Sequence, residues 1–171
     1  MITLIAGTSH TGKTNLAQRL LEKHGWPYLS LDHLKMGLIR SGYTDLTVEQ
    51  DDELTVLMWP IVREMIKTAI ENEQHMVIEG CYLPFDWRKD FPPEYLPHIR
   101  FVCLVMTEDY IRTHFADIRA FASVVENREE EAELDMEALL QDNAQNLEAC
   151  RRNGCEVILI DGEYRVELPP C

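Results

Sequence analysis

The sequence predicts an α/β fold in which a five-stranded parallel sheet is covered by helices on both faces, giving three layers. Short apolar runs alternate along the chain with helical patterns, which is typical of such sheets. A glycine-rich turn joins the first apolar run to the first helical pattern. No linker, repeat or low-complexity tract interrupts this order, so we expect a single domain over residues 1–171.

The expected strands are the five apolar runs, each bounded by polar or turn-forming residues. They comprise residues 2–6, 28–31, 76–78, 101–106 and 157–160. A further stretch, residues 83–97, contains four prolines and several aromatic residues. We expect it to be a long irregular excursion near the carboxyl end of the third strand, an edge at which open α/β sheets bind ligands.

Glycine residues mark the ends of the first and last expected helices. The first begins at Gly12 and ends at Gly25, with Pro27 shortly beyond, as a helix with glycine at its C′ position does. The last covers residues 135–153 and ends at Gly154, which suits a left-handed turn into the final strand.

Polar caps predict where the middle helices begin. Thr47 and Gln50 have the spacing of a capping box and open a long helical stretch toward Ile70. Pro60 lies within that stretch and is expected to kink or divide the helix. Thr107 is the expected N-cap of the helix that follows the fourth strand.

The most specific motif is the turn after the first strand, which fits the pattern GxxxxGKT. Glycines let such a loop point several N–H groups inward, and the helix that follows presents its positive end to the same place. The pattern therefore predicts a cradle for nucleotide phosphates, in which Lys13 reaches the β- and γ-phosphates and Thr14 holds Mg²⁺. The cradle residues are Gly7, Thr8, Ser9, His10, Thr11, Gly12, Lys13 and Thr14.

Acidic residues follow three of the other expected strands, on the edge where the cradle opens. Phosphoryl transfer needs an acid that helps to position Mg²⁺ and a polar group near the attacking nucleophile. Glu79 is the candidate for the first role and Asp32 for the second, although Asp32 is also a plausible helix cap. Asp161 and Gly162 have the form of a turn.

Composition excludes several classes of partner. The formal net charge of −14 argues against DNA or RNA, because binding to a phosphate backbone needs a basic face. No apolar run reaches the length of a membrane-spanning helix, and we expect a cytoplasmic protein. The five cysteines form no CxxC pair and are expected to be reduced thiols, with Cys103 in the core and Cys171 exposed.

The order of these features resembles the small P-loop kinases of the adenylate kinase and shikimate kinase group. The resemblance is carried by the GxxxxGKT loop, which is a Walker A motif, and by Asp32, Arg40 and Glu79 in suitable places. The run of residues 31–40 is similar to proteins described as adenylate kinase-like or 2-phosphoglycerate kinase-like. The Asp-Gly-Phe-Pro-Arg run that adenylate kinases carry after the third strand is absent.

The resemblance implies a P-loop NTPase fold with strand order 2-3-1-4-5 and ATP lying over the cradle, its adenine near Asp161 and Gly162. It also implies a lid in roughly residues 112–135 that supplies arginines to the transferring phosphate. Arg112, Arg119 and Arg128 are the matching residues, with Arg112 on ATP and Arg119 in a catalytic role beside Lys13 and Asp32. The acceptor site would contain Asp32, Lys35, Arg40 and Arg88.

The expected activity is that of a P-loop phosphotransferase, an ATP- and Mg²⁺-dependent kinase of a small hydroxyl-bearing metabolite. A nucleoside or nucleotide acceptor is the alternative within the same fold, and a nucleotide-binding regulatory NTPase or switch is the alternative from another class. Tyr82 is an aromatic residue with the potential to stack on a substrate. We expect ATP and the acceptor as partners, no nucleic acid or membrane, and a monomer or homodimer.

Overall fold

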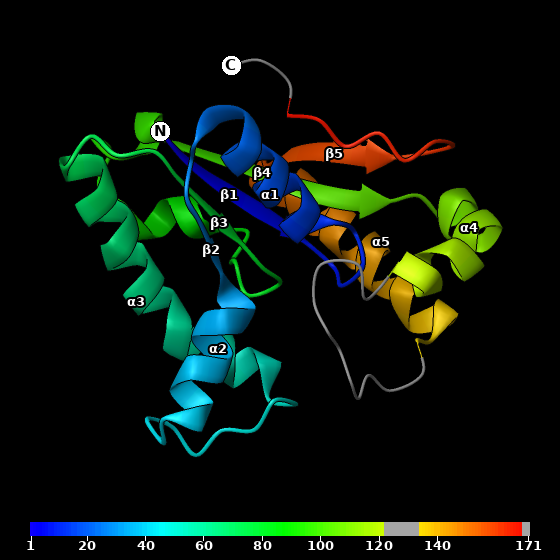
Figure 1. Ribbon diagram of the computed structural model, residues 1–171, viewed down its shortest axis with the longest axis horizontal. Coiled ribbons are helices and arrows are strands. Elements are labelled where there is room, and N and C mark those ends of the chain that lie inside the picture. The colour runs from blue at the N-terminus through cyan, green and yellow to red at the C-terminus, as the bar shows by residue number, and fades with distance from the viewer. Residues whose placement is uncertain (122–133, 169–171) are drawn as a thin grey trace.

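The computed structural model describes residues 1–121 and 134–168, and its centre is a five-stranded parallel sheet. The strands lie in the order β2-β3-β1-β4-β5, as expected (Figure 1). Their bounds differ from the expected ranges by at most two residues. They are β1 Ile2–Gly7, β2 Tyr28–Ser30, β3 Met76–Glu79, β4 Ile99–Met106 and β5 Glu156–Ile160.

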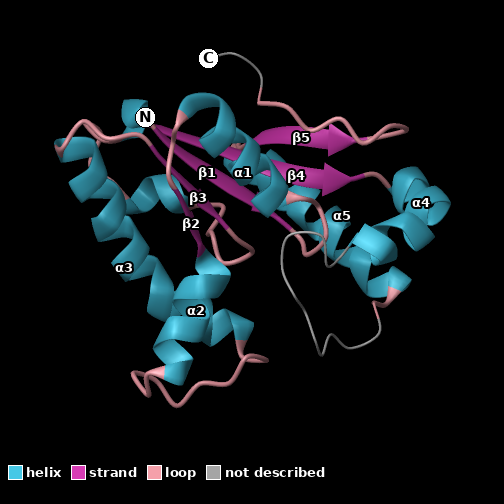
Figure 2. Ribbon diagram, viewed as in Figure 1, coloured by secondary structure: helices cyan, strands magenta, loops and turns pink. Residues whose placement is uncertain are grey.

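Helices cover both faces of the sheet, which gives the three layers that the sequence predicts (Figure 2). One face carries the apolar sides of α1 and α4, and the other carries α3 and the segment between β3 and β4. The helices are α1 Lys13–His24, α2 Leu31–Arg40, α3 Asp51–Glu71, α4 Glu108–Phe121 and α5 Met136–Asn153.

Side-chain alternation along β4 shows how one strand supports both layers. Phe101 and Cys103 belong to the core on the α3 side, whereas Val102 and Leu104 belong to the core on the α1 side. All four side chains are buried, because a strand in the middle of a doubly covered sheet exposes neither face. Burial of Cys103 agrees with the expectation, while Cys171 lies outside the described residues.

Expected ends of three helices, α1, α4 and α5, are confirmed in detail. Gly12 and Gly25 flank α1 in the left-handed conformation, at φ of 84° and 70°. Thr107 Oγ1 accepts a hydrogen bond of 3.2 Å from the N–H of Tyr110 and caps α4. Asp135 accepts bonds from two N–H groups in the first turn of α5, and Gly154 ends that helix at φ 61°.

The structure tests two expectations for α3. Pro60 does not divide the helix, since α3 is continuous from Asp51 to Glu71. Pro60 is exposed, so water can satisfy the carbonyl that loses its partner there. Thr47 does not cap the helix either: Gln50 Oε1 accepts from the Thr47 N–H at 3.0 Å, but helical geometry begins at Asp51.

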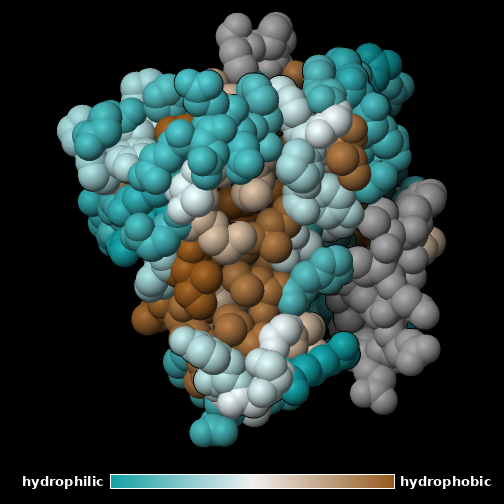
Figure 3. All heavy atoms as spheres, turned by 60° about the vertical axis from the view of Figure 1, so that its left-hand side comes forward, coloured by the Kyte–Doolittle hydropathy of each residue, from teal (hydrophilic) through white to brown (hydrophobic). Residues whose placement is uncertain are grey.

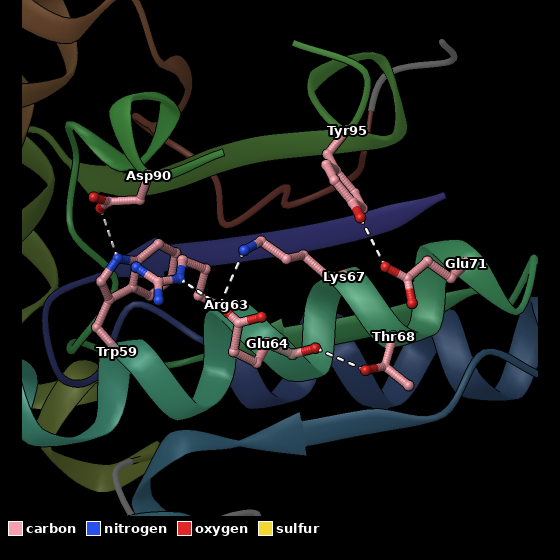
Figure 4. Close-up of polar contacts among 8 residues, drawn as sticks. All are labelled: Trp59, Arg63, Glu64, Lys67, Thr68, Glu71, Asp90 and Tyr95. Atoms are coloured by element: carbon pink, nitrogen blue, oxygen red, sulfur yellow. Dashed lines mark hydrogen bonds and ion pairs between the residues drawn. The ribbon is translucent and has the colours of Figure 1, made fainter. Parts of the chain in front are cut away.

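The proline-rich stretch 83–97 is largely irregular, as expected, and its apolar side chains form part of the core. It runs back across the sheet between β3 and β4 through two short 3-10 helices, Trp87–Asp90 and Leu96–His98. Trp87 is buried and stacks on Phe101 with ring centroids 6.2 Å apart. Two hydrogen bonds tie the stretch to α3, from Trp59 Nε1 to Asp90 and from the Tyr95 hydroxyl to Glu71 (Figure 4).

We expect Trp87→Ala to lower the free energy of unfolding by about 3–5 kcal/mol, because it removes a fully buried aromatic side chain and leaves a cavity. The measurement is urea unfolding followed by circular dichroism. Tyr43→Ala is the control: Tyr43 is 70% exposed, so its loss should change stability by no more than about 0.5 kcal/mol. Equal, small losses in both variants would contradict the core role of the stretch.

Apolar side chains also gather on one outer face of the molecule (Figure 3). On α3 the exposed large apolar residues include Val56, at 75% exposure, and Met65. Among the helices in the described part of the chain, none is long and apolar enough to cross a membrane.

Candidate functional site

The loop between β1 and α1 depends on two glycines. Gly7 has φ 143°, and a Cβ there would lie 2.7 Å from the carbonyl oxygen of Leu104 on the neighbouring strand. Gly12 has φ 84°, and a Cβ there would lie 1.7 Å from the hydroxyl oxygen of Tyr164. Both positions combine a backbone conformation that L-residues avoid with a lack of space, so only glycine fits this loop.

The side chains of the loop turn inward on one carbonyl group. Lys13 is 7% exposed, and its Nζ donates a hydrogen bond of 2.8 Å to the carbonyl of Thr8. The hydroxyl of Thr11, which is fully buried, donates to the same carbonyl at 2.9 Å. The loop therefore holds a buried positive charge at the amino end of α1, where the helix dipole adds to the positive potential.

Thr14 joins this loop to the end of β3. Its hydroxyl donates a hydrogen bond of 3.1 Å to Oε1 of Glu79, which is 1% exposed. Burial raises the pKa of Glu79, opposed by the hydroxyls of Ser30 and Thr14 and by the charge of Lys13. The Ser30 hydroxyl is close enough to lower this pKa. It is buried and has no hydrogen-bond partner within the described residues.

The residues Thr14 and Glu79 fit a divalent cation such as Mg²⁺. Glu79 Oε2 is buried and lacks a hydrogen-bond partner in the part of the chain that the structure describes. A buried carboxylate oxygen without a partner is costly unless water or a cation satisfies it. Hydroxyl and carboxylate oxygens, with water, are the ligands that Mg²⁺ prefers.

The raised pKa of Glu79 predicts how acidity affects stability. The folded chain holds this proton more tightly than the unfolded chain does. The contribution of Glu79 to the free energy of unfolding is therefore most favourable below its ordinary pKa of 4.5, and it is lost as the pH rises through the pKa of the folded chain. The stability of Glu79→Gln relative to the wild type should therefore increase as the pH rises. Urea midpoints between pH 4 and about 8 in chelator-containing buffer would measure this.

Exposed Glu94→Gln serves as the control for this pH series. We expect its difference from the wild type to stay nearly constant, because an exposed carboxyl group loses little solvation on folding. A Glu79→Gln difference that is equally flat would contradict the role of burial.

Asn143 is a residue of this site that the sequence did not indicate. It is 2% exposed on α5, and its amide group donates to Thr8 Oγ1 at 3.0 Å and to the Leu139 carbonyl at 2.8 Å. Its Oδ1 accepts from the N–H of Met106 at 2.9 Å. Asn143 thus ties the loop to the end of β4, and nothing in its helical sequence context distinguishes it from a surface asparagine.

Across the sheet edge, four polar side chains from three segments form a second group. Asp32 and Lys35 lie on the first turns of α2, with 3.5 Å between Oδ1 and Nζ. Lys35 Nζ donates to the hydroxyl of Tyr82 at 2.5 Å, and that hydroxyl donates to Asp51 Oδ1 at 2.9 Å. Asp32 follows the N-cap residue Ser30, so it lies within the helix rather than capping it.

This second group is near the phosphate loop. Ser30, at the end of β2, pairs with Glu79 in the parallel register of the sheet, and Asp32 lies two residues beyond Ser30. Glu79 in turn accepts a hydrogen bond from Thr14 of the loop. The structure therefore brings Asp32 and Lys35 together with Glu79, Thr14 and the loop at one edge of the sheet.

The remaining candidates lie in different surroundings. Arg40 is exposed in the last turn of α2. Arg88 does not join the other residues expected in the acceptor site. Its guanidinium donates to the carbonyls of Asn153 and Gly154 at the carboxyl end of α5. Asp161 accepts a hydrogen bond of 3.1 Å from Thr107, and Gly162 adopts φ 69° in the turn beside it.

The arginines expected in a lid are placed only in part. Arg112 on α4 is half-exposed and pairs with Glu108 at 2.9 Å and with Glu137 at 3.7 Å. Arg119 lies in the last turn of the same helix. Arg128 lies outside the described residues, as does the rest of the segment 122–133.

Comparison with known proteins finds similarity in structure but not in sequence. No family model matches the chain, and no curated protein matches it. The deoxyadenosine kinase of M. mycoides with bound dATP superimposes with a TM-score of 0.58 at 16% identity, over 97% of this chain and 93% of that one. The same enzyme with dCMP and dCDP gives 0.54 at 14% identity, over 94% and 90%.

A gluconokinase from Sinorhizobium meliloti 1021 is also similar, at 17% identity over 88% of this chain and 93% of that one, with a TM-score of 0.41. At these identities the likeness concerns the fold. The chain shares its α/β fold with the deoxyadenosine kinase of M. mycoides, and its parallel sheet has the order β2-β3-β1-β4-β5.

Proposed function

We propose that this protein is a kinase that transfers the γ-phosphoryl group of ATP, with Mg²⁺, to a small hydroxyl-bearing molecule. The observation that carries the proposal is the arrangement at the carboxyl edge of the sheet. A phosphate-type loop with a buried Lys13 and the Thr14–Glu79 pair lies beside Asp32, which is one-third exposed. One side suits a triphosphate, and the other suits a hydroxyl that must lose a proton.

In the proposed reaction the acceptor hydroxyl donates a hydrogen bond to Asp32, and its oxygen attacks the γ-phosphorus. The bond from that phosphorus to the β–γ bridging oxygen breaks, and the hydroxyl proton passes to Asp32. The products are ADP and the phosphorylated acceptor. The loop N–H groups and Lys13 compensate the charge that spreads over the γ-phosphoryl oxygens.

Thr14 and Glu79 are the residues that would hold Mg²⁺, Glu79 through its unpartnered Oε2 or through water. The ion supplies charge neutralisation on the β- and γ-phosphate oxygens. Asn143 keeps Thr8 in register with β4, so the loop is held in shape before the nucleotide arrives.

In this proposal the lid comprises roughly residues 112–135. Arg112 contacts the nucleotide and Arg119 the transferring phosphate, while the turn at Asp161 and Gly162 flanks the base. Support for these roles is positional: α4 follows β4 and the turn follows β5, and both begin at the edge where the phosphate loop opens. Closing such a lid excludes water that would otherwise hydrolyse ATP.

A nucleoside or nucleotide acceptor is the second candidate. The neighbour with a TM-score of 0.58 is a deoxyadenosine kinase, which favours this candidate at the level of the fold. If the acceptor is a nucleotide, exposed Arg40 at the end of α2 would hold its phosphate. A regulatory NTPase would use the same loop but would need no group for an acceptor, and the Asp32–Lys35 pair argues against it.

The experiment that tests nucleotide binding is isothermal titration with a non-hydrolysable ATP analogue, with and without Mg²⁺. We expect saturable binding that Mg²⁺ strengthens in the wild type, and we expect Glu79→Gln to lose most of the Mg²⁺ effect. Failure of the wild type to bind the analogue would contradict the proposal.

A further inference from the structure

We propose that Tyr82 and Asp51 are positioning residues of the acceptor site, which hold Lys35 so that the site recognises two neighbouring oxygens of the acceptor. One oxygen is the reacting hydroxyl, which donates to Asp32, and the other accepts a hydrogen bond from Lys35. This inference rests on the proposed function and names its substrate class, a molecule whose reacting hydroxyl has an oxygen-bearing neighbour.

The first step concerns how Lys35 is held. Lys35 Nζ lies 2.5 Å from the Tyr82 hydroxyl oxygen but 3.5 Å from Asp32 Oδ1. A charge-assisted bond between ammonium and carboxylate is ordinarily about 2.7–2.9 Å long. Lys35 is therefore fixed mainly by Tyr82, and its contact with Asp32 is loose.

The loose contact leaves Asp32 able to accept another hydrogen bond. A carboxylate has about four lone-pair positions, and the side chain of Asp32 is 32% exposed. An ammonium has three donors, of which Tyr82 and Asp32 take two in the described structure. A neutral acceptor with two adjacent oxygens fits this pair: its hydroxyl donates to Asp32, and the second oxygen takes the remaining Lys35 donor.

The second step concerns how Tyr82 is held. It is 5% exposed, and its hydroxyl donates to Asp51 at 2.9 Å while it accepts from Lys35. Burial and the neighbouring carboxylates Asp51 and Asp32 raise the pKa of Tyr82, so the hydroxyl keeps its proton and its direction of donation. The Lys35 ammonium also lies 5.0 Å from the centre of the Tyr82 ring.

This network connects three segments that are far apart in the sequence. Lys35 comes from α2, Asp51 from the first turn of α3, and Tyr82 from the segment just after β3. The hydrogen bonds of Tyr82 go to Lys35 and Asp51, whereas Glu79 accepts from Thr14 of the phosphate loop. A change at Tyr82 should thus act on acceptor binding and leave the nucleotide side unchanged.

The test is steady-state kinetics of Tyr82→Phe, Asp51→Asn and Lys35→Met with an acceptor that screening has shown the wild type to phosphorylate. Tyr82→Phe keeps the buried ring and removes one donor and one acceptor of hydrogen bonds to charged groups. We expect the KM for the acceptor to rise about tenfold or more, with the KM for ATP unchanged. Asp51→Asn should shift the same KM in the same direction.

Two control variants separate this role from general destabilisation. Tyr95→Phe removes a hydrogen bond of the same kind, from a tyrosine hydroxyl to Glu71, far from the site. Asp52→Asn removes an acidic charge from the same first turn of α3. Neither should change the KM for the acceptor. Equal KM values for the wild type and Tyr82→Phe would overturn the positioning role.

Recognition of two neighbouring oxygens of the acceptor is tested by a separate measurement. Acceptors are tested in pairs, such as a neutral 1,2-diol and the matching alcohol that lacks the second hydroxyl. The wild type should prefer the first about tenfold or more in kcat/KM, and Lys35→Met should lose this preference. A preference unchanged in Lys35→Met would overturn the inference alone, whereas transfer to no acceptor at all would overturn the proposed function together with it.

Discussion

Lys13→Met is expected to lower the rate of phosphoryl transfer at least about a hundredfold, because it removes the buried positive charge of the phosphate loop. The Met side chain keeps an apolar stem of similar length, so the fold of α1 should survive the change. Coupled-assay measurement of ADP formation, with circular dichroism as a check on folding, tests this expectation.

Lys23→Met provides the matched control for this variant. Lys23 lies on the same helix, in its last turn, away from the loop. We expect its turnover to equal that of the wild type. Equal turnover in Lys13→Met and the wild type would remove the assignment of residues 7–14 as a phosphate cradle.

Asp32→Asn should lower kcat about a hundredfold or more for a hydroxyl acceptor, since the amide cannot take the proton of the attacking hydroxyl. The substitution keeps the size of the side chain, so the KM for ATP should change little. The measurement is kcat and both KM values, with Asp45→Asn in the exposed segment between α2 and α3 as the control.

The same assay distinguishes the two acceptor classes. If the acceptor is a nucleoside monophosphate, Arg40→Ala should be the more damaging change, because its guanidinium would hold the acceptor phosphate. If the acceptor is an uncharged alcohol, Arg40→Ala should have little effect and Asp32→Asn should dominate. An Asp32→Asn enzyme as fast as the wild type would rule out a proton-accepting role for this residue.

The sheet and the ends of α1 and α5 were predictable because each depends on local sequence. Apolar runs mark buried strands, and Gly25, Asp135 and Gly154 act on the backbone within a turn of their own position. The phosphate loop was predictable for the same reason, since eight consecutive residues carry its pattern. The position of Asp32 and Glu79 at one edge followed from the parallel strands.

Other features depend on contacts between distant residues, which a local pattern does not contain. Asn143 meets Thr8 across 135 positions, and Tyr82 meets Lys35 across 47. Arg88 appeared suitable for an acceptor, but the proline-rich stretch carries it to the far end of α5. The packing of Trp87 from that stretch against Phe101 is likewise a contact that no local pattern specifies.

The most direct test of phosphoryl transfer is to incubate the wild type with Mg²⁺ and γ-labelled ATP against a panel of small hydroxyl, carboxyl and phosphate-bearing molecules. We predict that label appears in one class of hydroxyl-bearing acceptor, at a rate that Lys13→Met and Asp32→Asn each lower about a hundredfold or more. Release of label only as inorganic phosphate, or no consumption of ATP with any acceptor, would contradict the assignment of this protein as a kinase.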